Sequence, residues 1–199
     1  MNALLIVDIQ NDFMPGGPLP VAEADKIVPI VNELQSKFEL IVAAQDWHPA
    51  HHGSFAANYP GKKPGDRIML NSLEQILWPV HCVQNTPGAA FVDGLDTSRF
   101  ARVFHKGTDP RIDSYGAFFD NGHQKETRLE QFLKERKVTD VYIVGVATDY
   151  CVKFTALDGA QLGFKTHVFQ NACRGVNASP TDVKEAFAEM RRAGVILLD

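Results

Sequence analysis

Residues 141–152 read VYIVGVATDYCV, and this stretch decides the fold class. Its first half, Val141 to Val146, is apolar and rich in β-branched residues. The run is too short for a helix and too continuous for a half-exposed strand, so it predicts a buried strand of a parallel sheet. A helix is predicted directly after it, from Asp149 to Leu162, and Gly163 would end that helix. A strand followed at once by a helix is the repeating unit of an α/β fold.

The same alternation of apolar runs and helical patterns extends along the chain. A further helix is predicted around residues 25–38. Thr127 and Glu130 have the spacing of a capping box, which predicts a second helix after them. A third is predicted to begin at Ser179-Pro180 and to end at Gly194. The pattern predicts one α/β domain over residues 1–199, a three-layer α/β/α sandwich with a mostly parallel sheet of about six strands. The other predicted strands are Leu4 to Ile9, Leu40 to Ala44, Arg102 to His105, Thr166 to Phe169 and Val195 to Leu198.

Composition is that of an ordinary globular domain and argues against several partners. The chain has 199 residues, 45% of them hydrophobic, and a net charge of −4 without a basic run that could track phosphates, so no nucleic acid is expected. No apolar stretch reaches ~20 residues, so we expect no membrane span and no membrane partner. Three widely spaced cysteines do not suit a secreted disulfide framework, which favours a cytoplasmic location. Whether the chain forms a homo-oligomer is left open.

Reactive side chains follow four of the predicted strands. Asp8 lies near the end of the first, Asp46 and His48 follow the second, Lys106 follows the third, and Cys151 follows Val141 to Val146. Ligands of open parallel sheets bind at the carboxyl ends of the strands. We therefore expect these side chains to meet at one edge of the sheet.

Cys151 is the candidate nucleophile among the three cysteines. A helix N-terminus and a nearby Lys106 ammonium would both favour its thiolate, and Asp8 would be the base that takes its proton. The alternative is that Cys151 is a small buried apolar residue, Asp8 an acid that ends a strand, and Lys106 a solvated surface lysine. Cys82 and Cys173 show no comparable setting and are expected to be structural.

A second polar group lies at the start of the segment from 48 to 96, which is rich in proline and glycine and shows no sustained period. A loop region this long inside a domain is usually functional. Asp46 and His48 would project to the same side of extended backbone, and a carboxylate with imidazoles suits zinc, iron or manganese. His51 and His52 are adjacent, so at most one of them could join the same ion. The alternative is a polar loop whose histidines bond to backbone or water.

Five motifs occur in chain order: DIQNDF at 8–13, DWHP at 46–49, WPVHCV at 78–83, KG at 106–107 and GVATDYCV at 145–152. Together they resemble the nicotinamidases (pyrazinamidases) of the isochorismatase-like cysteine hydrolase superfamily. The aspartate, lysine and cysteine positions mark the superfamily. The aspartate and histidine set, with a tryptophan nearby, narrows the resemblance to nicotinamidases.

The resemblance implies an amidohydrolase that converts nicotinamide, and also pyrazinamide, to the acid and ammonia through a cysteine thioester, in NAD salvage. Asp8, Lys106 and Cys151 would be its catalytic triad. The backbone N–H groups of Ala147 and Cys151 would form the oxyanion hole, and the peptide bond between Val146 and Ala147 would be cis.

The resemblance also implies how the substrate and a cofactor are held. Asp46, His48 and His81 would bind one divalent transition metal ion, zinc in the first place and iron or manganese as alternatives. Phe13 and Trp78 would sandwich the pyridine ring of nicotinamide.

Several points are left open by the sequence. His52 matches an additional metal ligand of some relatives only loosely, and the loop from 53 to 66 could act as a lid. One alternative function is an isochorismatase-like hydrolase for another small substrate. A second is a metal-water hydrolase, in which the metal ligands activate the nucleophile and Cys151 only packs. A non-catalytic binding module is disfavoured because all three triad positions are present.

Overall fold

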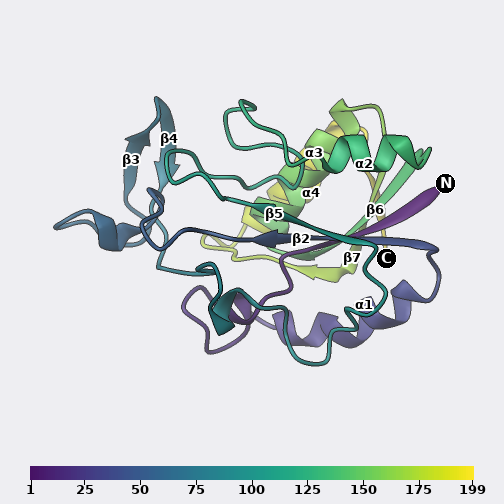
Figure 1. Ribbon diagram of the computed structural model, residues 1–199, viewed down its shortest axis with the longest axis horizontal. Helices are drawn as coiled ribbons and strands as arrows, with labels where there is room; N and C mark the ends of the chain where they lie inside the picture. Colours follow the sequence, from purple (N-terminus) through teal and green to yellow (C-terminus); the bar gives the residue numbers. More distant parts are fainter.

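A six-stranded sheet with the order β5-β2-β1-β6-β7-β8 runs through the middle of the molecule, and every neighbouring pair in it is parallel (Figure 1). The computed structural model describes all 199 residues. All six predicted strands are confirmed, with ends that differ by a few residues. They are β1 (Asn2–Val7), β2 (Leu40–Asp46), β5 (Arg102–Lys106), β6 (Asp140–Val146), β7 (Lys165–Arg174) and β8 (Ile196–Leu198).

Helices cover both faces of this sheet, so the predicted three-layer α/β/α architecture is confirmed. Helix α1 (Val28–Gln35) lies on one face, and α2 (Leu129–Glu135), α3 (Lys153–Gln161) and α4 (Asp182–Arg192) lie on the other (Figure 1). Side chains of a strand alternate between the two faces of a sheet. On β1, Leu4 and Ile6 therefore join the core under α1, and Ala3, Leu5 and Val7 join the core under the other three helices.

Two predicted helix starts are wrong because local polar groups use other partners. The Thr127 hydroxyl donates to the Ala117 carbonyl at 2.6 Å and accepts from the Leu129 N–H at 3.3 Å, and no capping box with Glu130 forms. Helix α4 begins at Asp182 instead of at Ser179-Pro180. The Asp182 carboxylate accepts from the Ser179 N–H at 2.7 Å, which holds this approach segment in a turn.

The predicted helix from 149 to 162 is present in two parts. Thr148–Val152 forms a π-helical turn, η5, and α3 follows directly. Cys151 lies in the π-helical turn and not in the first turn of an α-helix. None of the helices combines the length and the apolar character that a membrane span requires.

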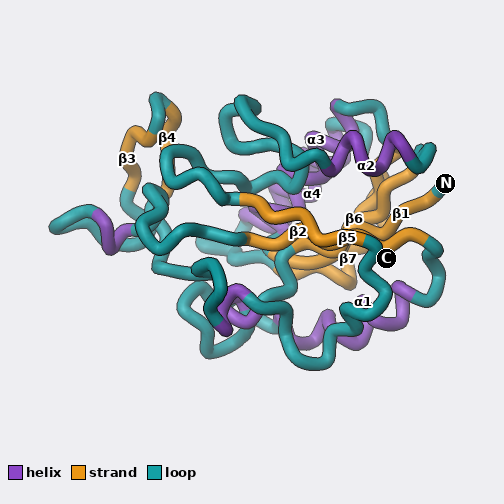
Figure 2. The backbone as a smooth tube through the Cα atoms, viewed as in Figure 1, coloured by secondary structure: helices purple, strands orange, loops and turns teal.

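The segment from 48 to 96 contains more regular structure than its sequence predicts. An antiparallel hairpin, β3 (Arg67–Leu70) with β4 (Leu73–Ile76), stands beyond one end of the main sheet (Figure 2). Short 3-10 turns occur at η3 (Ala56–Asn58) and η4 (Pro87–Ala89), and likewise earlier in the chain at η1 (Asn11–Phe13) and η2 (Ala24–Ile27). The rest of the segment is loop that packs around the carboxyl end of the sheet.

Gly145 allows β6 to approach β1 closely near that end. Its φ is +127°, and a Cβ atom at this position would lie 2.0 Å from the Val7 carbonyl oxygen. The pairing of β6 with β7 also shifts register between Ile143 and Gly145. Only glycine fits both the backbone conformation and the available space.

We expect Gly145→Ala to lower the free energy of unfolding by more than about 4 kcal/mol, because the added methyl group meets backbone that cannot move without breaking the sheet. Gly163→Ala is the matched control. Its φ is +86°, but nothing lies within 4 Å of the added Cβ, so only the backbone cost of about 1–2 kcal/mol applies. Urea unfolding of both variants measures the difference. Equal losses would show that crowding at Gly145 is unimportant.

Candidate active site

The carboxyl ends of β1, β2, β5 and β6 meet at one edge of the sheet. The strand order reverses between β1 and β6, which is where ligands bind in open α/β sheets. Asp8 follows β1, Asp46 ends β2, Lys106 ends β5, and Cys151 lies in η5 behind β6. The structure brings these four side chains together.

Lys106 lies at the centre of this cluster. Its Nζ is 2.8 Å from Asp8 Oδ2 and 2.5 Å from Asp46 Oδ1, and it donates to the Ser114 carbonyl at 3.1 Å. Cys151 Sγ is 3.4 Å from the same nitrogen. Burial opposes the charge on the lysine, but Asp46 and Asp8 outweigh it and raise the pKa of Lys106 well above its ordinary value. The side chain is thus a buried, permanently charged ammonium, in contrast to the solvated lysine considered above.

Asp8 has the properties of a general base. It is fully buried and has a left-handed φ of 53°, and apart from the ion pair with Lys106 neither carboxylate oxygen has a hydrogen-bond partner. Burial raises the pKa of Asp8 to about 7, against the opposing effect of Lys106. A carboxylate with a pKa near neutrality and free lone pairs suits general base and general acid chemistry.

Cys151 rests as a thiol. Burial raises its pKa well above the ordinary value against the opposing effect of Lys106, and the nearby carboxylates of Asp8 and Asp46 act in the same direction as burial. The expected thiolate, stabilised by a helix N-terminus, is therefore not the resting form. Because the thiol stays protonated, its use as a nucleophile requires a base beside it, and Asp8 lies in that position.

A set of metal-ligand donors adjoins this cluster. Nε2 of His48 lies 3.6 Å from Asp46 Oδ2, Nε2 of His81 lies 3.8 Å from the same oxygen, and the donor atoms of the three residues lie within 4.8 Å of one another. All three residues are buried. His51, in contrast, is exposed.

The remaining ring nitrogens of the two histidines support a ligand role. Nδ1 of His48 bonds to the Gly107 carbonyl at 2.9 Å, and Nδ1 of His81 bonds to the Pro79 carbonyl at 2.8 Å. A carbonyl only accepts, so each Nδ1 carries the hydrogen and each Nε2 keeps its lone pair. Two imidazoles and a carboxylate with free lone pairs fit a divalent transition metal ion.

Asp46 belongs to both groups. One carboxylate oxygen contacts Lys106, and the other faces the two histidines. Burial opposes its charge, but Lys106 and His48 outweigh this and hold the pKa of Asp46 well below its ordinary value. The Gln10 side chain fixes the backbone of Asp46, accepting from its N–H at 2.9 Å and donating to its carbonyl at 2.8 Å.

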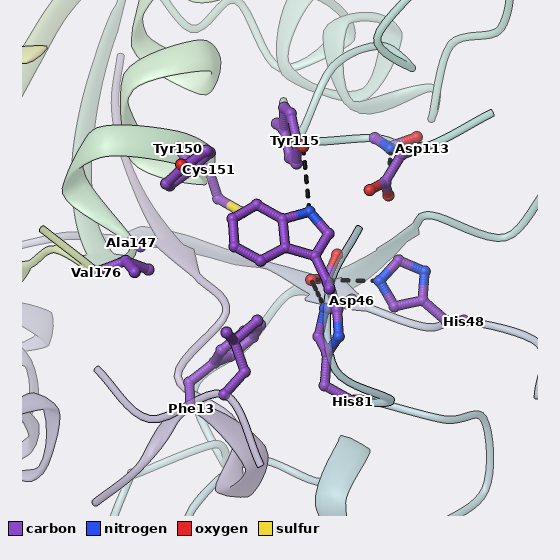
Figure 3. Close-up of a pocket in the computed structure, with 13 residues that line it drawn as sticks. Phe13, Asp46, His48, His81, Asp113, Tyr115, Ala147, Tyr150, Cys151 and Val176 are labelled. Atoms are coloured by element: carbon purple, nitrogen blue, oxygen red, sulfur yellow. Dashed lines mark hydrogen bonds and ion pairs between the residues drawn. The ribbon is translucent and has the colours of Figure 1, made fainter. Parts of the chain in front are cut away.

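A pocket opens above these two groups, with Cys151 on one side and Asp46, His48 and His81 on the other (Figure 3). Phe13 and Trp78 both line it, as expected for the residues that would hold an aromatic ring. Its other apolar walls are Leu19, Tyr115, Ala147, Tyr150 and Val176.

The backbone at Ala147 offers a donor next to the thiol. The peptide bond between Val146 and Ala147 is cis, which confirms that expectation. Ala147 lines the pocket, and its N–H makes no hydrogen bond within the protein. A free N–H in this position can receive charge that develops on a substrate oxygen.

The sequence reading missed the contribution of the loop after β5. Asp113, Ser114 and Tyr115 all line the pocket, and Asp113 and Ser114 are buried. The available signal was the length of this loop, because residues 107–128 form no helix or strand and such long loops are usually functional. Nothing in the loop's own pattern indicates which of its residues turn inward.

His52 lies beside the metal-ligand group although the sequence left its role open. It is fully buried, its ring centroid is 4.4 Å from that of His48, and its Nε2 has no hydrogen-bond partner. Donor atoms of His48, His52 and Asp113 form a second set within 4.8 Å. Burial lowers the pKa of His52 to about 4, so the ring is neutral.

Known proteins resemble this chain along nearly its whole length. The isochorismatase domain family matches residues 2–199. A nicotinamidase of Escherichia coli (strain K12) is 49% identical over 98% of this chain and 93% of its own length. A solved nicotinamidase and pyrazinamidase from Acinetobacter baumanii is 45% identical with a TM-score of 0.96, over 100% of this chain and 95% of its own. A pyrazinamidase of Pyrococcus horikoshii, solved in complex with zinc, is 41% identical with a TM-score of 0.82, over 100% and 98% of the two chains.

We expect His81→Gln to lower the affinity for a divalent metal ion by more than about 100-fold, because it removes one of three ligands that have free lone pairs. His51→Gln is the control, since His51 is exposed and near in sequence but outside the donor set. Titration of metal-free protein with zinc, followed by calorimetry, measures both. Unchanged zinc affinity in the His81 variant would exclude this residue as a ligand.

Proposed function

The chain belongs to the isochorismatase family, and we propose that this member is a nicotinamidase that converts nicotinamide to nicotinate and ammonia. The observation that carries the proposal is the placement of Cys151, Lys106 and Asp8 in one buried cluster at the wall of an aromatic pocket. Nicotinate is a precursor of NAD, so the reaction belongs to NAD salvage. Pyrazinamide, a planar ring amide of the same size, is the second substrate that this pocket suits.

The first half of the reaction is acyl transfer to the thiol. Asp8 accepts the Cys151 proton, and the thiolate attacks the carboxamide carbon of nicotinamide. Charge develops on the amide oxygen, where the N–H groups of Ala147 and Cys151 would stabilise it. The carbon–nitrogen bond then breaks, the leaving nitrogen takes the proton back from Asp8, and ammonia departs to leave a thioester on Cys151.

The second half returns the enzyme to its resting state. Asp8 takes a proton from water, and the resulting hydroxide attacks the thioester carbon. The carbon–sulfur bond breaks, and the proton on Asp8 returns to the Cys151 thiolate. Nicotinic acid is released and gives its carboxyl proton to solvent, which yields nicotinate. Lys106 stays protonated throughout. At each step it stabilises Asp8 or Cys151, whichever of the two carries the negative charge.

Asp46, His48 and His81 would hold one divalent metal ion, and we propose zinc on the grounds of the donor set and the zinc-bound pyrazinamidase relative. When bound, the ion supplies a Lewis-acidic position for the ring nitrogen of the substrate. Phe13 and Trp78 would hold the faces of the ring between them. The protein thereby holds the carboxamide close to Cys151 and oriented for attack. Proximity and orientation of this kind lower the activation barrier.

A metal-water hydrolase uses the same two groups in a different way. In that reaction Asp46, His48 and His81 would hold a metal ion that activates water as the nucleophile, and Cys151 would only pack. The observation against it is that Cys151, Lys106 and Asp8 are in contact while Asp8 keeps free lone pairs. A packing cysteine needs neither a buried ammonium nor a base beside it.

We expect Cys151→Ala to lower ammonia release from nicotinamide by at least about 1,000-fold while the bound metal content stays unchanged. Cys173→Ala is the control, because Cys173 is also buried but lines no part of this pocket. An ammonia-release assay with metal analysis of each variant tests this. Substantial turnover by Cys151→Ala, abolished by a chelator, would favour the metal-water hydrolase instead.

The pH dependence should follow Asp8. Burial raises its pKa to about 7, so below that pH the carboxyl is protonated and cannot accept the thiol proton. We expect kcat/KM for nicotinamide to fall as the pH decreases from about 7 to about 5, with a slope that approaches tenfold per pH unit at the lower end of this range. Steady-state kinetics at saturating zinc, with the metal content checked at each pH, measures the profile. A flat profile over this range would contradict the role of Asp8 as the base.

A further inference from the structure

The indole of Trp78 is held by a phenol from a distant part of the chain. Tyr115, in the loop after β5, accepts a hydrogen bond on its hydroxyl oxygen from Trp78 Nε1 at 3.1 Å. Gln75 Nε2, on β4, donates to the same oxygen at 3.2 Å. Two N–H donors occupy the lone pairs of the phenol oxygen, so its position is set from both sides.

The backbone that carries Tyr115 is itself fixed to the catalytic cluster. The Tyr115 N–H donates to Asn121 Oδ1 at 2.8 Å, and the preceding carbonyl, of Ser114, accepts from Lys106 at 3.1 Å. The phenol therefore stands in a defined place although its loop has no regular structure. The position of Trp78 is therefore linked to Lys106 through Tyr115 and the Ser114 carbonyl.

Aromatic contacts alone would not orient the indole. The ring of Tyr150 packs edge-on to Trp78, with centroids 4.9 Å apart and planes at 88°. Tyr150 also packs against Tyr115, with centroids 5.5 Å apart. Such contacts favour a separation and a tilt, but they restrain rotation of the indole about its Cα–Cβ and Cβ–Cγ bonds only loosely. The directional bond from Nε1 to Tyr115 restrains this rotation further.

The same three rings separate the catalytic pocket from the surface. Trp78, Tyr115 and Tyr150 line the pocket on one side and, on the other, a groove that runs between β3, β4 and helices α3 and α4. A displaced indole would therefore open the pocket wall toward this groove. Within this wall, the hydrogen bond from Trp78 to Tyr115 joins side chains that are 37 residues apart in the sequence.

We propose that Tyr115 is a positioning residue that holds the Trp78 indole as the wall of the ring-binding pocket and so sets KM for the aromatic amide. The proposal rests on the proposed function for its kinetic readout. Contacts to the ring are the same before and during attack on the carboxamide. Their loss therefore raises KM and leaves kcat unchanged.

The test is Tyr115→Phe, which removes the hydroxyl and keeps the ring. The net value of one hydrogen bond corresponds to a rise in KM for nicotinamide of roughly 2- to 13-fold, with kcat changed by less than about twofold. Tyr59→Phe is the matched control, because the half-buried Tyr59 donates to the Gly53 carbonyl at 2.9 Å and lines no part of the pocket. Its KM should equal that of the parent protein.

A second readout separates positioning from a general loss of structure. Trp78→Phe has no indole N–H, so Tyr115→Phe should add no further rise in KM in that background. Additive effects of the two substitutions would overturn the proposal, as would an unchanged KM in Tyr115→Phe or an equal fall in kcat and kcat/KM.

A third readout does not need the enzyme to be a nicotinamidase. The chain has only two tryptophans, Trp47 and Trp78, so a Trp47→Phe background reports the emission of Trp78 alone. Tyr115→Phe should shift this emission in the substrate-free protein, and Tyr59→Phe should not. Without activity on nicotinamide the proposed function fails, and the emission still decides whether Tyr115 positions Trp78; no shift would overturn that role.

Discussion

A lysine ammonium in the interior of the protein is the constraint on which the rest of the site depends. The side chain of Lys106 has no exposed surface, and a buried charge without partners costs several kcal/mol. Asp8, Asp46 and the Ser114 carbonyl supply those partners. Asp8 directly follows β1, Asp46 ends β2 and Ser114 lies in the loop after β5, so the charge is neutralised only when β2 pairs with both β1 and β5 in the observed register. Sheet formation and assembly of the site are therefore one event.

Asp46 links the two halves of the site because its carboxylate has two oxygens with different partners. One contacts Lys106, and through it the thiol of Cys151, while the other faces His48 and His81. Only the Lys106 side chain therefore lies between the nucleophile and the metal-ligand group. The Gln10 amide holds the Asp46 backbone in the position that allows both contacts.

Much of this architecture could be predicted from local pattern. Apolar runs rich in β-branched residues identified all six strands, because burial on both faces of a parallel sheet leaves that mark on the sequence. Polar residues directly after those runs identified the members of the site. The hairpin of β3 and β4 was missed because its short strands are half-exposed and leave no such run. Tyr115 was missed because a loop carries no periodicity to show which side chains turn inward.

The sequence by itself determined the succession of strands and helices along the chain. It also determined which chemical groups are available at the carboxyl edge of the sheet. Tertiary structure alone decided the protonation of those groups and their partners. Cys151 rests as a thiol and Asp8 has a pKa near neutrality because burial and neighbouring charges act on them. Strand propensity is a property of a few consecutive residues, whereas a pKa or a hydrogen bond such as that from Trp78 to Tyr115 depends on segments that meet only after folding.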